Sequence, residues 1–207
     1  MTQSVDMNLF LSLAKQTLRT PKDAARAVIN LNYPNVVWWQ VLALATVISG
    51  ILYGIEVGAA AREAGRNTSD FAWLGGPLQA TVVIAISALL TLWLIYFVGR
   101  MFGGTGSFSD TLAVVTWFHL LSTAVSVALA VFSFVIPSAI IGMASLAIMF
   151  VTFWVFISFI AAIHGFQNLF MVLVAFVATS AVMGFVISIL LLTLGLIELP
   201  VMETPNV

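Results

Sequence analysis

The sequence predicts an all-α membrane protein with five transmembrane helices, preceded by short cytoplasmic amphipathic helices. From Val36 onward the chain is almost continuously apolar, and its few charges fall into short gaps about one membrane thickness apart. Of its 207 residues, 62% are hydrophobic and only 7% are charged. In soluble domains roughly a quarter of the residues are charged. The apolar runs are too long for barrel strands, which alternate polar and apolar residues over about 10 positions. Helices also satisfy their own backbone hydrogen bonds in lipid.

The first element is a cytoplasmic N-terminal helical segment, residues 1–35, which we expect to contain two short helices. Thr20, Pro21 and Asp23 read as a helix start, because Thr20 can cap, Pro21 suits the first helical position and Asp23 completes a pattern like a capping box. This start predicts one helix near 4–19 and a second near 21–31.

Four cations in this segment recur at intervals of four, three and four residues, namely Lys15, Arg19, Lys22 and Arg26. One interpretation is that these cations face lipid headgroups, while apolar side chains press the first helix against the bilayer. Those side chains would be Leu9, Phe10, Leu13 and Leu18. The other interpretation is that the cations only fix the topology of the chain.

A transmembrane domain follows over residues 36–197, because a membrane helix needs about 20 apolar residues. Its spans are predicted at 36–60, 77–99, 110–132, 138–161 and 169–196. The first two are separated by a polar loop at 61–76, which holds Arg62, Glu63, Arg66 and Asp70. No charged residue stands between Thr111 and Ile163, a stretch that fits two spans, and Pro137 marks the break near Ser133 to Ser138.

The distribution of cations predicts the orientation of the spans. With the N-terminus inside, Arg100 joins the four N-terminal cations on the inner side, and Arg62 and Arg66 lie outside. Five spans then leave residues 198–207 as a short extracytoplasmic tail. We therefore expect a multi-pass protein of the cell membrane, the inner membrane in a bacterium.

Small residues at four-residue spacing mark two candidate packing faces. Gly50, Gly54 and Gly58 share one side of the first span and would allow another helix to approach closely. The fifth span repeats the spacing with Ser180, Gly184 and Ser188. The alternative is that small residues are simply frequent in membrane helices, and the sequence does not say whether a partner helix belongs to the same chain.

Glu56 and His119 are the two candidate polar residues within the membrane. Glu56 could be a buried proton or ion site, or it could lie at the outer interface shortly before Arg62. His119 stands near the middle of the third span, where it could move protons or bind a headgroup. The alternative is a neutral imidazole that is hydrogen bonded to a neighbouring helix.

The glycine-rich stretch from Gly103 to Ser107 resembles a phosphate-binding loop only in composition, since the Gly-Lys-Ser/Thr ending is missing. It fits a tight turn better, with Ser107 capping the third span and Asp110 three residues on. The chain has no cysteine, two histidines and a net charge of −1. We therefore expect no catalytic residues, no enzyme activity, no metal, no cofactor and no nucleic-acid partner.

Three short stretches resemble the Yip1-domain family, bacterial type. They are the helix start from Thr20 to Ala24, the turn from Gly103 to Phe108 with Asp110-Thr111-Leu112, and the span exit from Trp154 to Gly165 with Gln167-Asn168. The resemblance implies a five-helix integral membrane protein with a cytoplasmic N-terminus. Eukaryotic relatives bind small GTPases in vesicle traffic, but their Asp-Leu-Tyr-Gly-Pro signature is absent here, so no functional residue is carried over.

The leading hypothesis is a non-enzymatic role in membrane organisation, similar to trafficking, or in partner binding. The partners we expect are membrane lipid and either a second copy of the chain or other membrane proteins. The alternative is a small transporter or channel for ions or lipids, in which Glu56, His119, Gln40 and Arg100 would line a polar path.

Overall fold

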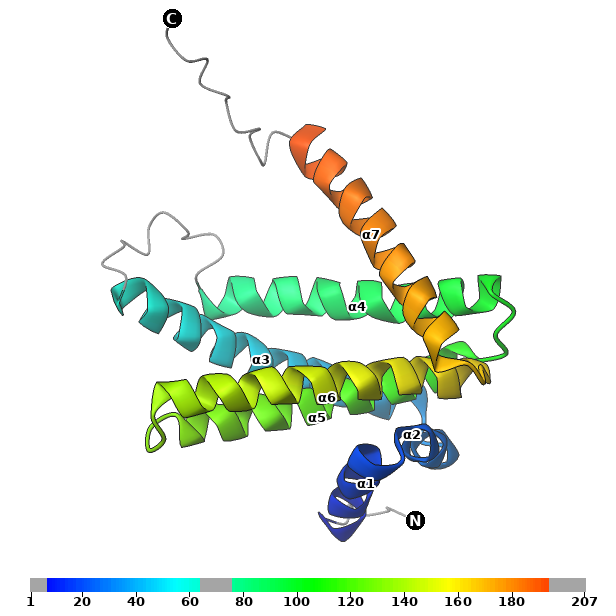
Figure 1. The fold of residues 1–207 in the computed structure, drawn as a ribbon, viewed down its shortest axis with the longest axis horizontal. Coiled ribbons are helices and arrows are strands. Elements are labelled where there is room, and N and C mark those ends of the chain that lie inside the picture. Colours follow the sequence, from blue (N-terminus) through cyan, green and yellow to red (C-terminus); the bar gives the residue numbers. More distant parts are fainter. Residues whose placement is uncertain (1–6, 64–75, 194–207) are drawn as a thin grey trace, which may run out of the picture. The chain divides into compact units, whose positions relative to one another are not determined.

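The computed structural model describes residues 7–63 and 76–193, and within these ranges the chain forms seven helices and no strand (Figure 1). Two short helices come first, and five long ones follow. Their bounds are α1 Met7–Arg19, α2 Pro21–Asn30, α3 Asn35–Glu63, α4 Pro77–Met101, α5 Phe108–Phe132, α6 Ser138–His164 and α7 Leu169–Thr193. The five long helices are all long and apolar enough to cross a membrane. The predicted fold class is therefore confirmed.

Several predicted features lie outside the described residues. They are the start of the first helix at 4–6, the charged loop residues Arg66 and Asp70, the end of the fifth span at 194–196, and the tail at 198–207. The chain divides into two compact units at Gln167, so α1 to α6 are described together and α7 is described by itself.

Of the two predicted helix starts, one has a side-chain cap and the other does not. At the start of α5, the Ser107 hydroxyl accepts from the Asp110 amide at 3.1 Å and the Asp110 carboxylate accepts from the Ser107 amide at 3.2 Å, so the predicted cap is present. At the start of α2, Pro21 begins the helix as predicted, but the Thr20 side chain makes no capping bond. That part of the prediction is wrong. The Asp23 carboxylate does not complete a capping box either, since it faces Arg26 at 3.3 Å.

Helix α3 is the central helix of the first unit, since it packs against both α4 and α5 (Figure 1). Glycines permit the close approach of α4. A Cβ atom added at Gly50 would lie 2.6 Å from Thr81 Cα, and one at Gly54 would lie 2.9 Å from Pro77 Cα. Nothing stands within 4 Å of a Cβ at Gly58. Two of the three glycines on this face therefore serve a contact within the chain.

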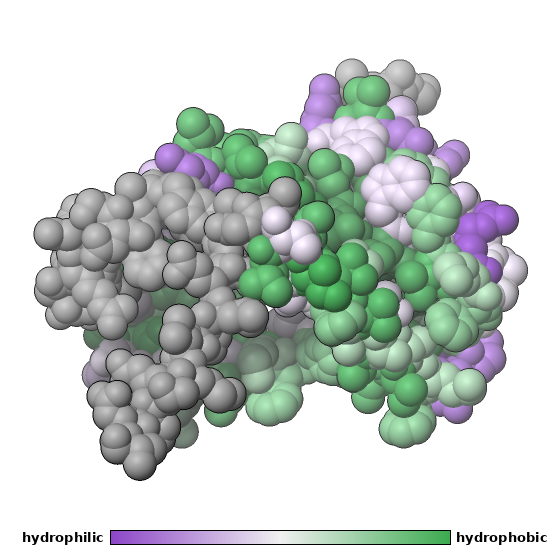
Figure 2. Space-filling model, turned by 90° about the horizontal axis from the view of Figure 1, so that it is seen from above, coloured by the Kyte–Doolittle hydropathy of each residue, from purple (hydrophilic) through white to green (hydrophobic). Residues whose placement is uncertain are grey.

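The side chains that face away from these contacts are mostly apolar. In the view of Figure 2, most of the coloured surface is hydrophobic, and hydrophilic residues gather toward its margins. Large apolar side chains such as Ile86, Met143 and Phe150 are more than half exposed. In water this surface would be unfavourable, whereas in a bilayer the acyl chains cover it.

Candidate functional site

The start of α3, the end of α4, the start of α5 and the end of α6 meet at one end of the first unit, which we call the docking end. The Ser109 hydroxyl donates to Asn35 Oδ1 at 2.6 Å, which ties the starts of α5 and α3 together. The Thr105 amide donates to the carbonyl of His164 at 3.3 Å, so the α4–α5 turn reaches the end of α6. The N-terminal helices α1 and α2 pack onto this end.

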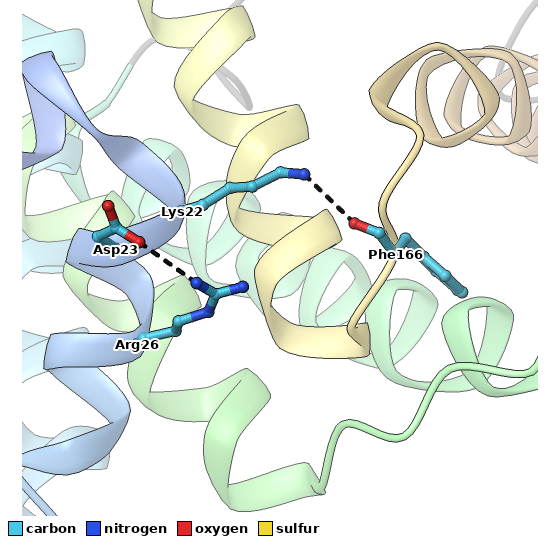
Figure 3. Close-up of polar contacts among 4 residues, drawn as sticks. All are labelled: Lys22, Asp23, Arg26 and Phe166. Carbon is cyan, nitrogen blue, oxygen red and sulfur yellow. Dashed lines mark hydrogen bonds and ion pairs between the residues drawn. The ribbon is translucent and has the colours of Figure 1, made fainter.

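Helix α2 lies against α6 and α5 through small apolar side chains. Ala24, Ala25 and Val28 are completely buried, and alanine at two of these positions lets the helices approach closely. Lys22 then extends from α2 toward the residues that follow α6, and its Nζ donates to the carbonyl of Phe166 at 3.3 Å (Figure 3). It also donates to the carbonyl of Gln167, at 3.3 Å. A cation at this position satisfies carbonyls beyond a helix C-terminus and interacts favourably with the helix dipole.

Helix α1 is fastened to α5 by a buried hydrogen-bond chain. The Trp117 Nε1–H donates to Thr17 Oγ1 at 3.2 Å, and the Thr17 hydroxyl in turn donates to the carbonyl of Leu13 at 2.9 Å. The ring of Phe10 stands edge-on to Trp117, with centroids 5.3 Å apart. Leu13, Thr17 and Trp117 are each at most 5% exposed, so water is excluded from this contact.

This contact changes the expectation for α1. In the interpretation that presses α1 against the bilayer, Phe10 and Leu13 would face lipid, but both pack on the protein, while Leu9 and Leu18 remain exposed. The four N-terminal cations are also not equivalent. Lys22 binds the carbonyls after α6, and Arg26 pairs with Asp23. Lys15 and Arg19 are exposed, and neither has an ion pair within the part of the chain that the structure describes.

The end of α6 contributes a residue that the sequence did not single out, His164. Its imidazole is 2% exposed, and Nε2 lies 3.0 Å from the carbonyl of Ile95. Because a carbonyl only accepts, Nε2 carries the hydrogen and Nδ1 is the free acceptor. Within the described residues, Nδ1 has no hydrogen-bond partner.

Three glycines make room for this imidazole. A Cβ atom added at Gly104 would lie 2.5 Å from His164 Nδ1, one at Gly106 would lie 3.1 Å from it, and one at Gly99 would overlap the ring. The turn itself is tight, as predicted, with Gly103 at a φ of 83°. Gly104 and Gly106 therefore leave the space that the His164 ring occupies, although His164 lies about 60 residues away in sequence. No local sequence motif could reveal a contact over this separation.

His119 lies in a polar cluster between α5 and α3. Its Nε2 is 3.4 Å from the hydroxyl of Thr46, which donates to the carbonyl of Leu42 at 2.7 Å. The hydroxyls of Ser49 and Thr123 are 2.8 Å apart, and Thr123 donates to the carbonyl of His119 at 2.9 Å. Both series of hydrogen bonds end on backbone carbonyls, an arrangement suited to joining two helices.

The remaining candidates are dispersed. Glu56 is an exposed residue near the far end of α3, Gln40 is exposed near its start, and Arg100 is exposed at the docking end, 5.8 Å from the ring of Tyr96. Among the described residues, no hydrogen bond or ion pair connects Glu56, His119, Gln40 and Arg100 to one another. Within the same ranges, no three acidic or histidine side chains could hold a metal ion.

On α7, described by itself, the sequence places Ser180, Gly184 and Ser188 four residues apart on one side of the helix.

Five long apolar helices and two short helices docked at one end define the chain as a multi-pass α-helical membrane protein. The Yip1 domain family matches residues 15–198, which covers most of the chain and includes both α2 and the glycine-rich turn. The chain therefore belongs to the Yip1-domain family. No curated protein and no solved structure shows significant similarity to it.

Proposed function

We propose that this protein is a non-enzymatic member of its family that organises membranes by binding, and that the docked α1–α2 pair is its binding platform. The observation that carries the proposal is the attachment of this pair through the buried residues Thr17 and Trp117 and through the partly buried Lys22. A helix pair held by buried contacts presents its outer side in a fixed position, which lowers the entropic cost of binding.

The charge distribution supports a cytosolic position for this platform. Lys15, Arg19, Lys22 and Arg26 lie on α1 and α2, and Arg100 lies at the end of α4, so five of the seven cations belong to the docking end. Cations concentrate on the cytoplasmic side of membrane proteins. The docking end then faces the cytosol, and five crossings carry the C-terminus to the outside of the cell membrane.

Photo-crosslinking in native membranes tests the platform. A photo-reactive residue is placed at the exposed position Ser12, and the control is the same residue at the buried position Ala25. We expect discrete adducts at Ser12, identified by mass spectrometry, and their loss when Trp117→Ala releases α1. Adducts that do not depend on Trp117, or none at Ser12, would contradict the platform.

A second candidate is a small transporter or channel for ions or lipids, which the polar cluster at His119 favours. Its hydrogen bonds support this candidate weakly, because they end on the carbonyls of Leu42 and His119 and do not lead to another ionisable group. Flux assays on reconstituted vesicles separate the two functions. We expect no movement of protons, ions or lipids down applied gradients, and flux that is abolished by His119→Leu would replace the binding role.

A further inference from the structure

The two flanks of the docked α1 helix differ in chemistry. Successive side chains on a helix turn by about 100°, so Phe10, Leu13 and Thr17 share the side that faces the bundle. One neighbouring flank carries Met7, Leu11 and Leu18, which are 67%, 57% and 63% exposed. The opposite flank carries Ser12 and Gln16, with Leu9, 36% exposed, at its edge. A helix with one apolar and one polar flank, fixed beside a membrane bundle, matches the boundary between acyl chains and water.

Lys15 and Arg19 occupy the arc between the two flanks, on the side of α1 opposite the bundle, with Lys15 nearer the apolar flank. They stand four residues apart, so their side chains project in nearly the same direction. Both are exposed, and within the described ranges neither has an ion pair. The other two N-terminal cations are held by contacts within the protein. The fold thus leaves Lys15 and Arg19 as a neighbouring pair without an ion pair in the described ranges, whereas Lys22 contacts backbone carbonyls and Arg26, 60% exposed, contacts Asp23.

We propose that this flank of α1 binds acidic phospholipids in the leaflet next to the docking end. Met7, Leu11 and Leu18 enter the acyl-chain boundary, and Lys15 and Arg19 contact headgroup phosphates. The charge of the pair matches an acidic lipid surface, and long cationic side chains reach outward from the apolar boundary. The inference rests on the proposed platform and names a lipid ligand for one flank of α1, beside the polar flank that carries Ser12.

Because the chain has no cysteine, single introduced cysteines give unambiguous probe positions. The full-length protein carries a nitroxide label at Leu11→Cys and, as the matched control, at the neighbouring exposed position Ser12→Cys. Each is reconstituted in vesicles of phosphatidylcholine alone and in vesicles that also contain phosphatidylglycerol. The accessibility of each label to a lipid-soluble and to a water-soluble relaxation agent is then measured.

We expect the Leu11 label to favour the lipid-soluble agent, and to do so more strongly in the acidic vesicles, while the Ser12 label favours the aqueous agent. Lys15→Gln combined with Arg19→Gln should remove the difference between the two lipid compositions, and high salt should reduce it. A Leu11 label that is accessible to water in both vesicles overturns the proposal. A lipid-facing label without any effect of phosphatidylglycerol overturns its acidic-headgroup part.

A third position separates this failure from failure of the platform. Leu13 is 5% exposed against the bundle, so a cysteine there should resist alkylation in both vesicle types. If Leu13→Cys is protected and the Leu11 label is water-accessible, only the lipid inference fails. If Leu13→Cys reacts readily, α1 is not docked, and the proposed platform fails with it.

Discussion

The imidazole of His164 fills space that depends on the absence of side chains on three glycines. Its single hydrogen bond, to the carbonyl of Ile95, orients the ring, and Gly104 approaches the opposite nitrogen. A methyl group at Gly104 or Gly106 cannot be accommodated without displacing the end of α6 or the turn. The glycine-rich stretch is thus explained by packing, and not by a phosphate ligand.

Gly104→Ala should therefore lower stability by about 1–3 kcal/mol, the usual range for overpacking. The matched control is Gly58→Ala, because a Cβ atom there meets nothing within 4 Å. Thermal unfolding in detergent measures both. Removing the ring with His164→Ala should reduce the additional cost of Gly104→Ala, since the two residues are in direct contact. If the stability losses of Gly104→Ala and His164→Ala simply add, the imidazole does not occupy the space beside Gly104.

The indole of Trp117 offers a second test at the scale of one residue. Trp117→Phe removes the donor to Thr17 Oγ1 while retaining an aromatic ring beside Phe10. We expect a loss of about 1 kcal/mol, typical of one hydrogen bond, and faster proteolysis near α1. The control is Trp93→Phe, because Trp93 is 52% exposed on α4. Equal effects of the two substitutions would argue against docking through Trp117.

At the scale of elements, the two similar helix starts differ in their use of a side-chain cap. Ser107 caps α5 reciprocally with Asp110, whereas the Thr20 side chain makes no cap at α2. Ser107→Ala should cost about 1 kcal/mol, and Thr20→Ala should cost clearly less. Thermal unfolding of the two variants under identical conditions provides the comparison. A larger loss for Thr20→Ala would contradict the described start of α2.

The lengths of the helices and the Ser107 cap were predictable because each depends on a short stretch of chain. An apolar run defines a span by itself, and a serine reaches only as far as the next turn. The bundle-facing side of α1 was not predictable. Leu11 and Leu13 are equally apolar, and the packing of α1 against α2, α6 and Trp117, the last about 100 residues away, determines which of them is buried.

At the scale of the whole molecule, tight packing is concentrated at the docking end. Residues 111–117 of α5 and most residues from 155 to 164 of α6 are buried. In the opposite halves of both helices most side chains are exposed, and lipid would cover them. The sequence indicated the candidate cations but not this asymmetry. It arises because α1, α2 and the α4–α5 turn all cover the same end.

The proposed orientation requires the two chain termini to lie on opposite sides of the membrane. Reporter domains that are active on only one side, fused to either end, should therefore give opposite results in cells. Each reporter is fused to one end of an otherwise unchanged chain, so that each fusion serves as the control for the other. The same result at both ends would exclude five crossings.

The contact between Lys22 and Phe166 spans 144 positions of sequence and has a consequence for biosynthesis. At a translation rate of about 5–20 residues per second, the ribosome needs on the order of ten seconds after making Lys22 to reach its acceptor. During that interval the nascent α1–α2 segment has no completed receptor, although its apolar side chains are already outside the ribosome. Until α6 has been inserted, these side chains lack part of the contacts that bury them in the folded protein.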